Sequence, residues 1–191
     1  MTRLVTLLLL AFLVYGLAQA EKALAARNTS YTRTVETYQV PDVTLINQDG
    51  ARISLRSLLT QDSPVLVDFA YTTCTTICPL LSANFANVQR TLIEETVEVR
   101  LVTISIDPEF DSPQQMKAYL KRYQAKPGWD FLTGSRQDID LVLKAFKIFI
   151  RNKMDHPPVI LLKSPSDTRW VRVTGLVGTS ELLVEYEKVR R

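Results

Sequence analysis

The two cysteines of this chain, Cys74 and Cys78, are separated by three residues and followed at once by Pro79. They are the only thiols in a chain of 191 residues. Three kinds of chemistry use such a pair: a structural disulfide, a dithiol redox couple, and a pair of ligands for a soft metal ion.

The spacing of the two thiols relates them to the start of a helix. If residues 74–78 are helical, both side chains lie on one face, with Cβ atoms about 5–6 Å apart. Pro79 disfavours helical geometry at the residue before it, so Cys78 is alternatively the N-cap. The sequence leaves both geometries open. Either one places the sulfurs at the positive end of a helix, where a thiol pKa falls and the pair becomes a better ligand and a more reactive redox couple.

A purely structural disulfide is the least favoured of the three uses. A bridge between Cys74 and Cys78 closes a loop of only a few residues, so it removes little entropy from the unfolded chain. With 46% hydrophobic residues, a chain of this length can bury a sizeable core without such a bridge.

His156 is the only histidine, and it offers a third soft donor. Two thiolates and one imidazole suit copper(I) in trigonal geometry and also hold copper(II). Zinc accepts the same donors but usually takes a fourth ligand, which water or Asp107 would have to supply. Considered alone, His156 is expected to be an ordinary surface or hydrogen-bonded histidine. Met154 is a further soft donor nearby, and it reads more simply as a packing or loop residue.

The first twenty residues have the composition of a targeting segment. Residues 4–18 are uncharged and mostly apolar, and Ala18-Gln19-Ala20 has the small-x-small form of a signal-peptidase site. The apolar stretch is shorter than the ~20 residues of a membrane-spanning helix. We expect residues 1–20 to be a cleaved signal peptide, with a retained membrane anchor over residues 4–20 as the alternative.

Either alternative places the protein outside the cytoplasm. We expect it in the bacterial periplasm, soluble or anchored to the inner membrane. Residues 21–36 are polar and aperiodic and are predicted to be a linker, followed by one domain over residues 37–191. The net charge is only +3, with no basic stripe that carries aromatic residues, so nucleic acid is not expected as a partner.

The rest of the chain alternates between strand and helix patterns. Asp49-Gly50 predicts an N-terminal β-hairpin, and Val159–Leu162 with Trp170–Val173 predicts a second one. The remaining strands are predicted at residues 64–70, 97–106 and 129–132, and helices are predicted to begin near Pro79, Ser112, Ser135 and Thr179. This order predicts an α/β domain in which a central mixed sheet is flanked by helices.

The candidate residues all lie next to predicted strands. Cys74 and Cys78 follow the strand at residues 64–70, Asp107 ends the next strand, and His156 lies in the loop before Val159. In open α/β sheets, functional groups gather where strands end and loops lead into helices. We therefore expect the thiols, the acid and the imidazole to converge on one edge of the sheet.

Five segments together resemble a known family: CTTICP, SIDPEFDSP, FLTGSRQDIDLVLKAF, DHPPVILL and VRVTGLVG. They are similar to the SCO/SenC family, which consists of thioredoxin-fold copper proteins that assist assembly of the CuA centre of cytochrome c oxidase. The resemblance covers about residues 37–191. It implies a thioredoxin-like fold, one copper ion per chain and a cuproprotein client, with a cytochrome c oxidase subunit as the expected partner.

Carried over position by position, Cys74 and Cys78 match the family's two thiolate ligands, and His156 matches its imidazole ligand. Asp107 matches an aspartate close to the site, where a supporting role is expected; the simpler alternative is that it shapes the turn with Pro108. The sequence departs from many members in the residues between the cysteines, in the short loop before His156, and in the two prolines that follow this histidine.

Two functions remain in competition. The first is a copper-binding assembly factor, or metallochaperone, which is not an enzyme and needs Cys74, Cys78 and His156 together. The second is a thiol–disulfide oxidoreductase that uses the redox-active pair Cys74/Cys78 without an obligate metal. The two are compatible, since reduction of a client's cysteines can precede copper delivery. The residue pattern of peroxide-reducing relatives is absent from the sequence.

Overall fold

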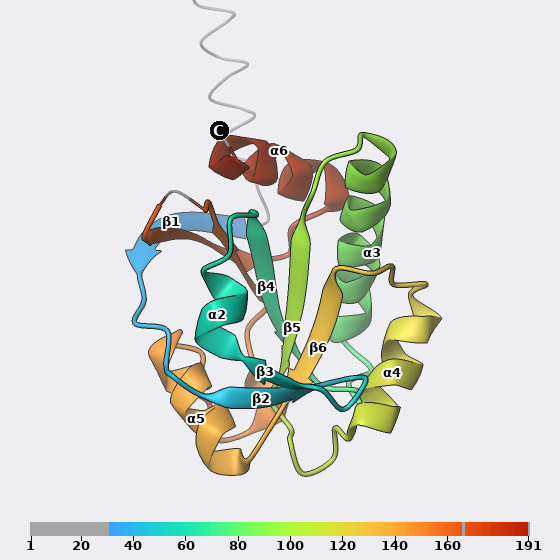
Figure 1. The fold of residues 1–191 in the computed structure, drawn as a ribbon, viewed down its shortest axis with the longest axis vertical. Helices are drawn as coiled ribbons and strands as arrows, with labels where there is room; N and C mark the ends of the chain where they lie inside the picture. The colour runs from blue at the N-terminus through green and yellow to red at the C-terminus, as the bar shows by residue number, and fades with distance from the viewer. Residues whose placement is uncertain (1–30, 166, 191) are drawn as a thin grey trace, which may run out of the picture. The chain divides into compact units, whose positions relative to one another are not determined.

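The computed structural model describes residues 31–165 and 167–190, which form an eight-stranded sheet with helices on both faces (Figure 1). The strand order is β1-β8-β7-β4-β5-β6-β2-β3. The strands are β1 (Tyr31–Thr37), β2 (Thr44–Asn47), β3 (Arg52–Ser54), β4 (Val65–Ala70), β5 (Arg100–Ser105), β6 (Trp129–Thr133), β7 (Val159–Lys163) and β8 (Arg169–Gly175).

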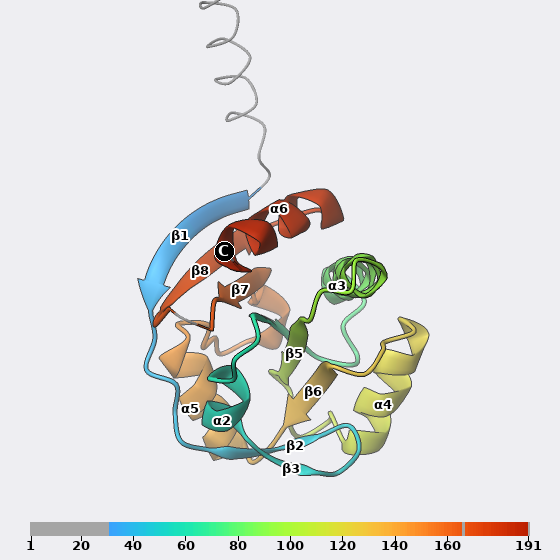
Figure 2. The ribbon, with the colours of Figure 1, turned by 45° about the horizontal axis from the view of Figure 1, so that its top comes forward.

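Figures 1 and 2 show α3, α4 and α6 on one face of the sheet, and α2 and α5 on the other. The described helices are α2 (Leu55–Leu59), α3 (Cys78–Glu94), α4 (Pro113–Arg122), α5 (Arg136–Ala145), the 3-10 helix η1 (Lys153–Asp155) and α6 (Thr179–Arg190). Ser112 caps α4 in a reciprocal capping box with Gln115, and Ser135 caps α5. The helix starts predicted at both serines are confirmed.

The sheet combines parallel and antiparallel pairing, as predicted. β4, β5 and β6 run parallel to one another, joined by crossovers through α3 and α4. β7 pairs antiparallel with β4, and β8 pairs antiparallel with β7, which forms the second hairpin. The carboxyl end of β4 therefore lies beside the amino end of β7, and the loops attached to these two strand ends meet there.

The N-terminal hairpin is formed by β2 and β3, which pair antiparallel around the predicted turn. Gly50 has a positive φ of 80°, a conformation that favours glycine and explains its place in this turn. β2 also pairs with β6, so the hairpin extends the sheet at one side.

The linker predicted over residues 21–36 was wrong for its last part, because residues 31–36 belong to strand β1. This strand pairs antiparallel with β8 along its whole length and forms the other edge of the sheet. Most of its side chains are exposed and polar, so it lacks the apolar pattern that marks a buried strand. The short helices α2 and η1 were also not predicted.

The signal peptide or anchor expected over residues 1–20 lies outside the described residues. Among the residues that the structure describes, no helix combines the length and the apolar character needed to cross a membrane.

Strand β4 lies at the centre of the core and is buried along its whole length. Phe69 packs against Phe146 beyond the end of α5, so its neighbour Asp68 points to the opposite face, beneath α3 and α4. Asp68 is completely buried, and among the described residues neither carboxylate oxygen has a partner with hydrogen-bond geometry. Thr103 stands beside it in β5, but its hydroxyl accepts a hydrogen bond from Trp129 Nε1. Burial raises the pKa of Asp68 to about 7, and the Thr103 hydroxyl offsets only part of this effect.

The raised pKa predicts how stability depends on pH. Between the ordinary value of 3.8 and about 7, the folded protein holds a proton on Asp68 that the unfolded chain releases. The free energy of unfolding should therefore fall as pH rises through this window, by a few kcal/mol at ~1.4 kcal/mol per pKa unit. In Asp68→Asn this part of the pH dependence should disappear. Urea unfolding of both proteins at pH 4 to 8 checks this, and parallel pH profiles would contradict it.

Candidate metal and redox centre

Cys74 and Cys78 lie in different local structures. Cys74 stands in the irregular loop after β4, and Cys78 is the first residue of α3. The cap of this helix is Ile77, and Pro79 lies in its first turn. Both alternatives drawn from the sequence are thus corrected: residues 74–77 are not helical, and Cys78 is inside the helix rather than its N-cap. Proline is tolerated there because the first turn has no intrahelical acceptors for its N–H groups.

His156 comes to the thiols from the loop before β7, the strand that pairs with β4 on the side away from β5. It follows η1 and precedes β7, so the antiparallel pairing of β7 with β4 brings it to the edge at which β4 ends. The donor atoms of Cys74, Cys78 and His156 all lie within 4.8 Å of one another. The Cys78 sulfur is 3.5 Å from His156 Nε2. The structure therefore brings together three of the four residues predicted for the site.

The three side chains are withdrawn from solvent. Cys74 is 7% exposed, Cys78 is 0% exposed and His156 is 6% exposed. Both cysteines are free thiols in this structure. The Tyr71 ring stands edge-on to the imidazole, with ring centroids 6.2 Å apart.

The hydrogen bond of the other imidazole nitrogen determines which nitrogen faces the thiols. His156 Nδ1 lies 3.1 Å from the Pro157 carbonyl oxygen, which can only accept, so Nδ1 carries the proton. In the neutral ring Nε2 is then unprotonated and faces Cys78 with its lone pair. Burial lowers the pKa of His156, and the Pro157 carbonyl opposes this only in part. The imidazole is thus held neutral and ready to bind a metal ion or accept a hydrogen bond.

The two thiols differ in acidity. Burial opposes ionisation of Cys74. Hydrogen bonds outweigh this effect and lower the pKa of Cys74 to about 7; they come from the side chain and backbone of Cys78 and from the backbone and hydroxyl of Thr76. Burial, together with the Cys74 side chain, raises the pKa of Cys78. Cys74 is therefore the thiolate of the pair near neutral pH, and Cys78 is the protonated partner.

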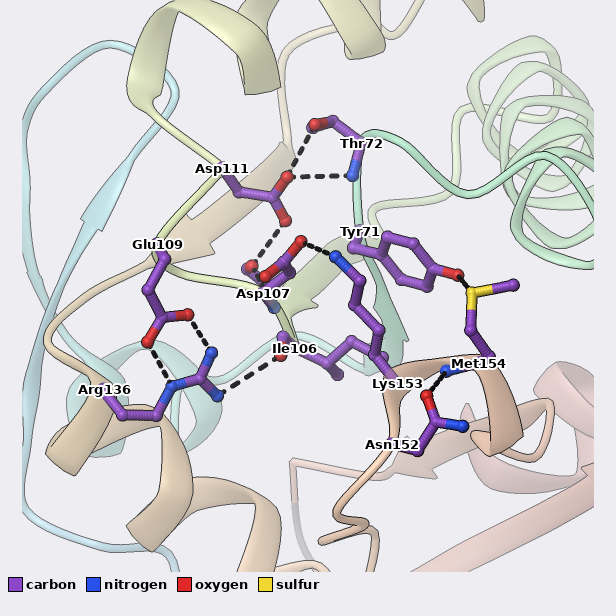
Figure 3. A network of polar contacts seen from close by, with 11 residues as sticks. Tyr71, Thr72, Ile106, Asp107, Glu109, Asp111, Arg136, Asn152, Lys153 and Met154 are labelled. Atoms are coloured by element: carbon purple, nitrogen blue, oxygen red, sulfur yellow. Dashed lines mark hydrogen bonds and ion pairs between the residues drawn. The ribbon is translucent and has the colours of Figure 1, made fainter.

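Among the described residues, the group of clustered donors leaves out Asp107, the fourth residue predicted for the site. Asp107 forms an ion pair with Lys153 of η1 (Figure 3). Its backbone N–H donates to the Ser105 hydroxyl. Asp107 thus joins the loop after β5 to the loop that carries His156.

Met154 lies close to the site without being buried in it. Its sulfur accepts a hydrogen bond from the Tyr71 hydroxyl at 3.2 Å, and the residue is 61% exposed (Figure 3). Three residues around the site were not predicted from the sequence: Tyr71, Lys153 and Asp111. The one available signal was the position of Asp111 in the SIDPEFDSP segment, four residues after Asp107.

The donor set has a clear chemical preference. Two sulfurs and one imidazole nitrogen at mutual distances below 5 Å can surround a single ion, and a buried three-donor set suits copper(I) better than zinc, which usually takes four ligands. The unequal thiols also suit disulfide exchange, which requires one thiolate for the attack. The fold and the site together define a thioredoxin-like protein with a dithiol–imidazole centre.

Comparison with known proteins places this chain within that class. The family model described as SCO1/SenC matches residues 32–182, and the chain belongs to this family. The SCO1 protein homolog of Bacillus subtilis (strain 168) is 39% identical over 126 residues, which cover 64% of this chain and 64% of that relative. The alignment with this relative thus spans less than two thirds of its length.

Two solved structures have the same fold. One is BsSco, described as a member of the Sco family of cytochrome c oxidase assembly proteins: the TM-score is 0.67 at 32% identity, covering 80% of this chain and 93% of that one. The other is Arabidopsis thaliana ScoI with copper bound: the TM-score is 0.64 at 26% identity, covering 78% of this chain and 98% of that one.

The difference between the thiols predicts a difference in reactivity with pH. Iodoacetamide should modify Cys74 with a midpoint near pH 7, because its pKa is about 7, while Cys78 reacts only at higher pH. In Cys78→Ala the Cys74 midpoint should rise, since a hydrogen bond that stabilises the thiolate is lost. Mass spectrometry of peptides labelled at pH 5 to 10 measures both midpoints, with Thr75→Ala as the control in the same loop. Equal midpoints for the two cysteines would refute the assignment.

Proposed function

We propose that this protein binds one copper ion through Cys74, Cys78 and His156 and delivers it to a cuproprotein, with the CuA site of cytochrome c oxidase as the expected destination. The observation that carries the proposal is the convergence of three soft donors within 4.8 Å, on elements far apart in the sequence. The copper bound in Arabidopsis thaliana ScoI and the description of BsSco as an assembly protein support the assignment.

The physical properties of the site favour binding and release of a cargo ion. About half of the Cys74 thiols are ionised near neutral pH, because the pKa is about 7, and His156 Nε2 is unprotonated. Cys78 is protonated and must lose its proton when copper binds. Copper(I) exchanges between thiolate, thioether and imidazole donors, so a client with similar ligands can take it up. Cys74 and His156 lie in loops at the carboxyl end of β4 and keep a small exposed fraction, and this is the side from which a client reaches the site.

The same residues support a second candidate function, exchange of thiols and disulfides with the client. The Cys74 thiolate attacks a client disulfide, forming a mixed disulfide and releasing one client thiolate. Cys78 then gives its proton to the client thiolate released in the first step and attacks Cys74, which yields the Cys74–Cys78 disulfide and releases the second client thiolate. This function would prepare the client's cysteines for copper. The specific observation in its favour is the unequal acidity of the two thiols.

Exchange with a client disulfide suits a compartment outside the reducing cytoplasm, because disulfides persist there. We propose that residues 1–20 direct export, so that the domain acts in the bacterial periplasm, either free or held at the inner membrane. The small-x-small site at residues 18–20 supports cleavage, and the apolar stretch before it is what an anchor would use.

Copper binding by variants tests the proposal. The reduced wild-type protein, loaded without oxygen, should hold about one copper(I) per chain, and loss of one ligand in Cys74→Ser, Cys78→Ser or His156→Ala should weaken binding more than ~100-fold. Thr75→Ala, an exposed change between the two cysteines, is the matched control. Competition with a chromogenic copper(I) chelator gives the affinities. Wild-type affinity in His156→Ala would remove the imidazole from the site and favour the dithiol function alone.

The ion pair between Asp107 and Lys153 is proposed to hold the His156 loop in place. Asp107→Asn and Lys153→Met should each weaken copper(I) binding about tenfold, the usual effect of removing a group that orients a metal ligand. The control is Glu109→Gln on the same loop, because the exposed Glu109 forms its ion pair with Arg136, while Lys153 of the His156 loop acts on it only through the weaker, longer-range attraction of opposite charges (Figure 3). Unchanged affinity in both variants would mean that Asp107 only shapes its own turn.

A further inference from the structure

The two thiols of the site are held in place by very different means. Cys78 belongs to the 17-residue helix α3, whose inner face packs into the core. Cys74 has no such support, since it lies in the loop between β4 and α3. Its backbone N–H donates to the Tyr71 carbonyl at 3.1 Å, and its sulfur lies 3.7 Å from the Thr76 hydroxyl. The position of Cys74 therefore depends on whatever fixes the turn of residues 71–74.

The group that contacts this turn is the carboxylate of Asp111. Its Oδ1 accepts two hydrogen bonds from Thr72, one from the backbone N–H at 2.9 Å and one from the hydroxyl at 2.6 Å (Figure 3). Its Oδ2 accepts a third from the Ser105 hydroxyl at 2.5 Å. Asp111 is 0% exposed, and hydrogen bonds to a buried carboxylate are among the stronger ones in proteins.

Asp111 is itself held firmly by the elements on either side of it. Its backbone N–H donates to the Asp107 carbonyl at 2.9 Å, which closes a turn at the end of β5. The next residue, Ser112, is the N-cap of α4 and forms a capping box. The carboxylate is thus fixed by a sheet strand and a capped helix, and it passes this rigidity to the cysteine loop.

We infer that Asp111 is a positioning residue of the site, which holds the turn of residues 71–74 so that the Cys74 sulfur faces Cys78 and His156. This inference rests on the proposed function, because it names the residue that prepares one ligand for copper. It differs from the role proposed for Asp107, whose ion pair reaches the loop of His156. The loop after β5 thus holds the two sides of the site through two separate carboxylates.

Copper(I) affinity in Asp111 variants tests the inference. Asp111→Ala should weaken binding about tenfold or more, as for other groups that orient a ligand. Asp111→Asn should stay within about threefold of the wild type, because the amide oxygen still accepts both bonds from Thr72 and the Ser105 hydroxyl can turn to accept from the amide. Asp130→Ala is the control: Asp130 accepts from Asn47 and Arg100 at the opposite end of the parallel strands.

Double variants separate a positioning role from a general loss of stability. If Asp111 acts through Cys74, Asp111→Ala should have almost no further effect on copper affinity in a Cys74→Ser background and its full effect in a His156→Ala background. A full effect in both backgrounds would overturn the inference. The same holds if Asp111→Ala weakens copper binding no more than Asp130→Ala.

A probe that needs no copper keeps this test independent of the proposed function. Phenylarsine oxide binds two neighbouring thiols and releases water, so it reports the placement of Cys74 against Cys78. The affinity for phenylarsine oxide should fall about tenfold in Asp111→Ala, which is the usual loss when a group that orients a metal ligand is removed. The affinity should be retained in Asp111→Asn. If the wild type fails to bind copper while this pattern holds, the proposed function fails and the inference stands. Equal arsenical binding in wild type and Asp111→Ala would overturn the inference.

Discussion

The antiparallel pairing of β7 with β4 is the constraint on which the site depends. β4 delivers the cysteine loop at its carboxyl end, and β7 receives the chain from the His156 loop at its amino end. Only opposite strand directions place these two loops at the same edge, since in a parallel pair the start of one strand lies beside the start of the other. The mixed character of the sheet is therefore a functional requirement of this fold.

Burial gives the three donors their chemistry. Withdrawal from water keeps His156 neutral and keeps Cys78 protonated, while hydrogen bonds overcome the same effect at Cys74 and ionise it. A dithiol–imidazole set with a single thiolate and a free imidazole nitrogen carries little charge to desolvate. It is nevertheless prepared to bind a soft cation or to begin thiol exchange, which is why one site can support both proposed functions.

Three buried aspartates in β4 and in the loop after β5 show how differently a buried carboxyl group can be used. Asp111 has three donors and organises a loop, and Asp107 has a lysine and connects two loops. Asp68 lies in the core without a well-placed donor, and burial raises its pKa. Asp107 gains the ion pair with Lys153, and Asp111 gains three hydrogen bonds that offset part of the loss of hydration, although burial still raises the pKa of Asp111. Among the described residues Asp68 gains no such bond, and it lowers the stability of the fold when it ionises.

The sequence alone determined the local elements and the identity of the donors. Apolar runs, serine caps and the Asp49-Gly50 turn predicted most strands and helices, because those signals depend on neighbours along the chain. The polar strand β1 was not predicted, because this edge strand is stabilised by pairing with β8 and carries no alternating apolar residues of its own. Only the tertiary structure decided that Cys74 lies outside the helix, that His156 meets the thiols, and that Asp111 supports Thr72. Each of these depends on contacts between distant segments, which local sequence patterns do not encode.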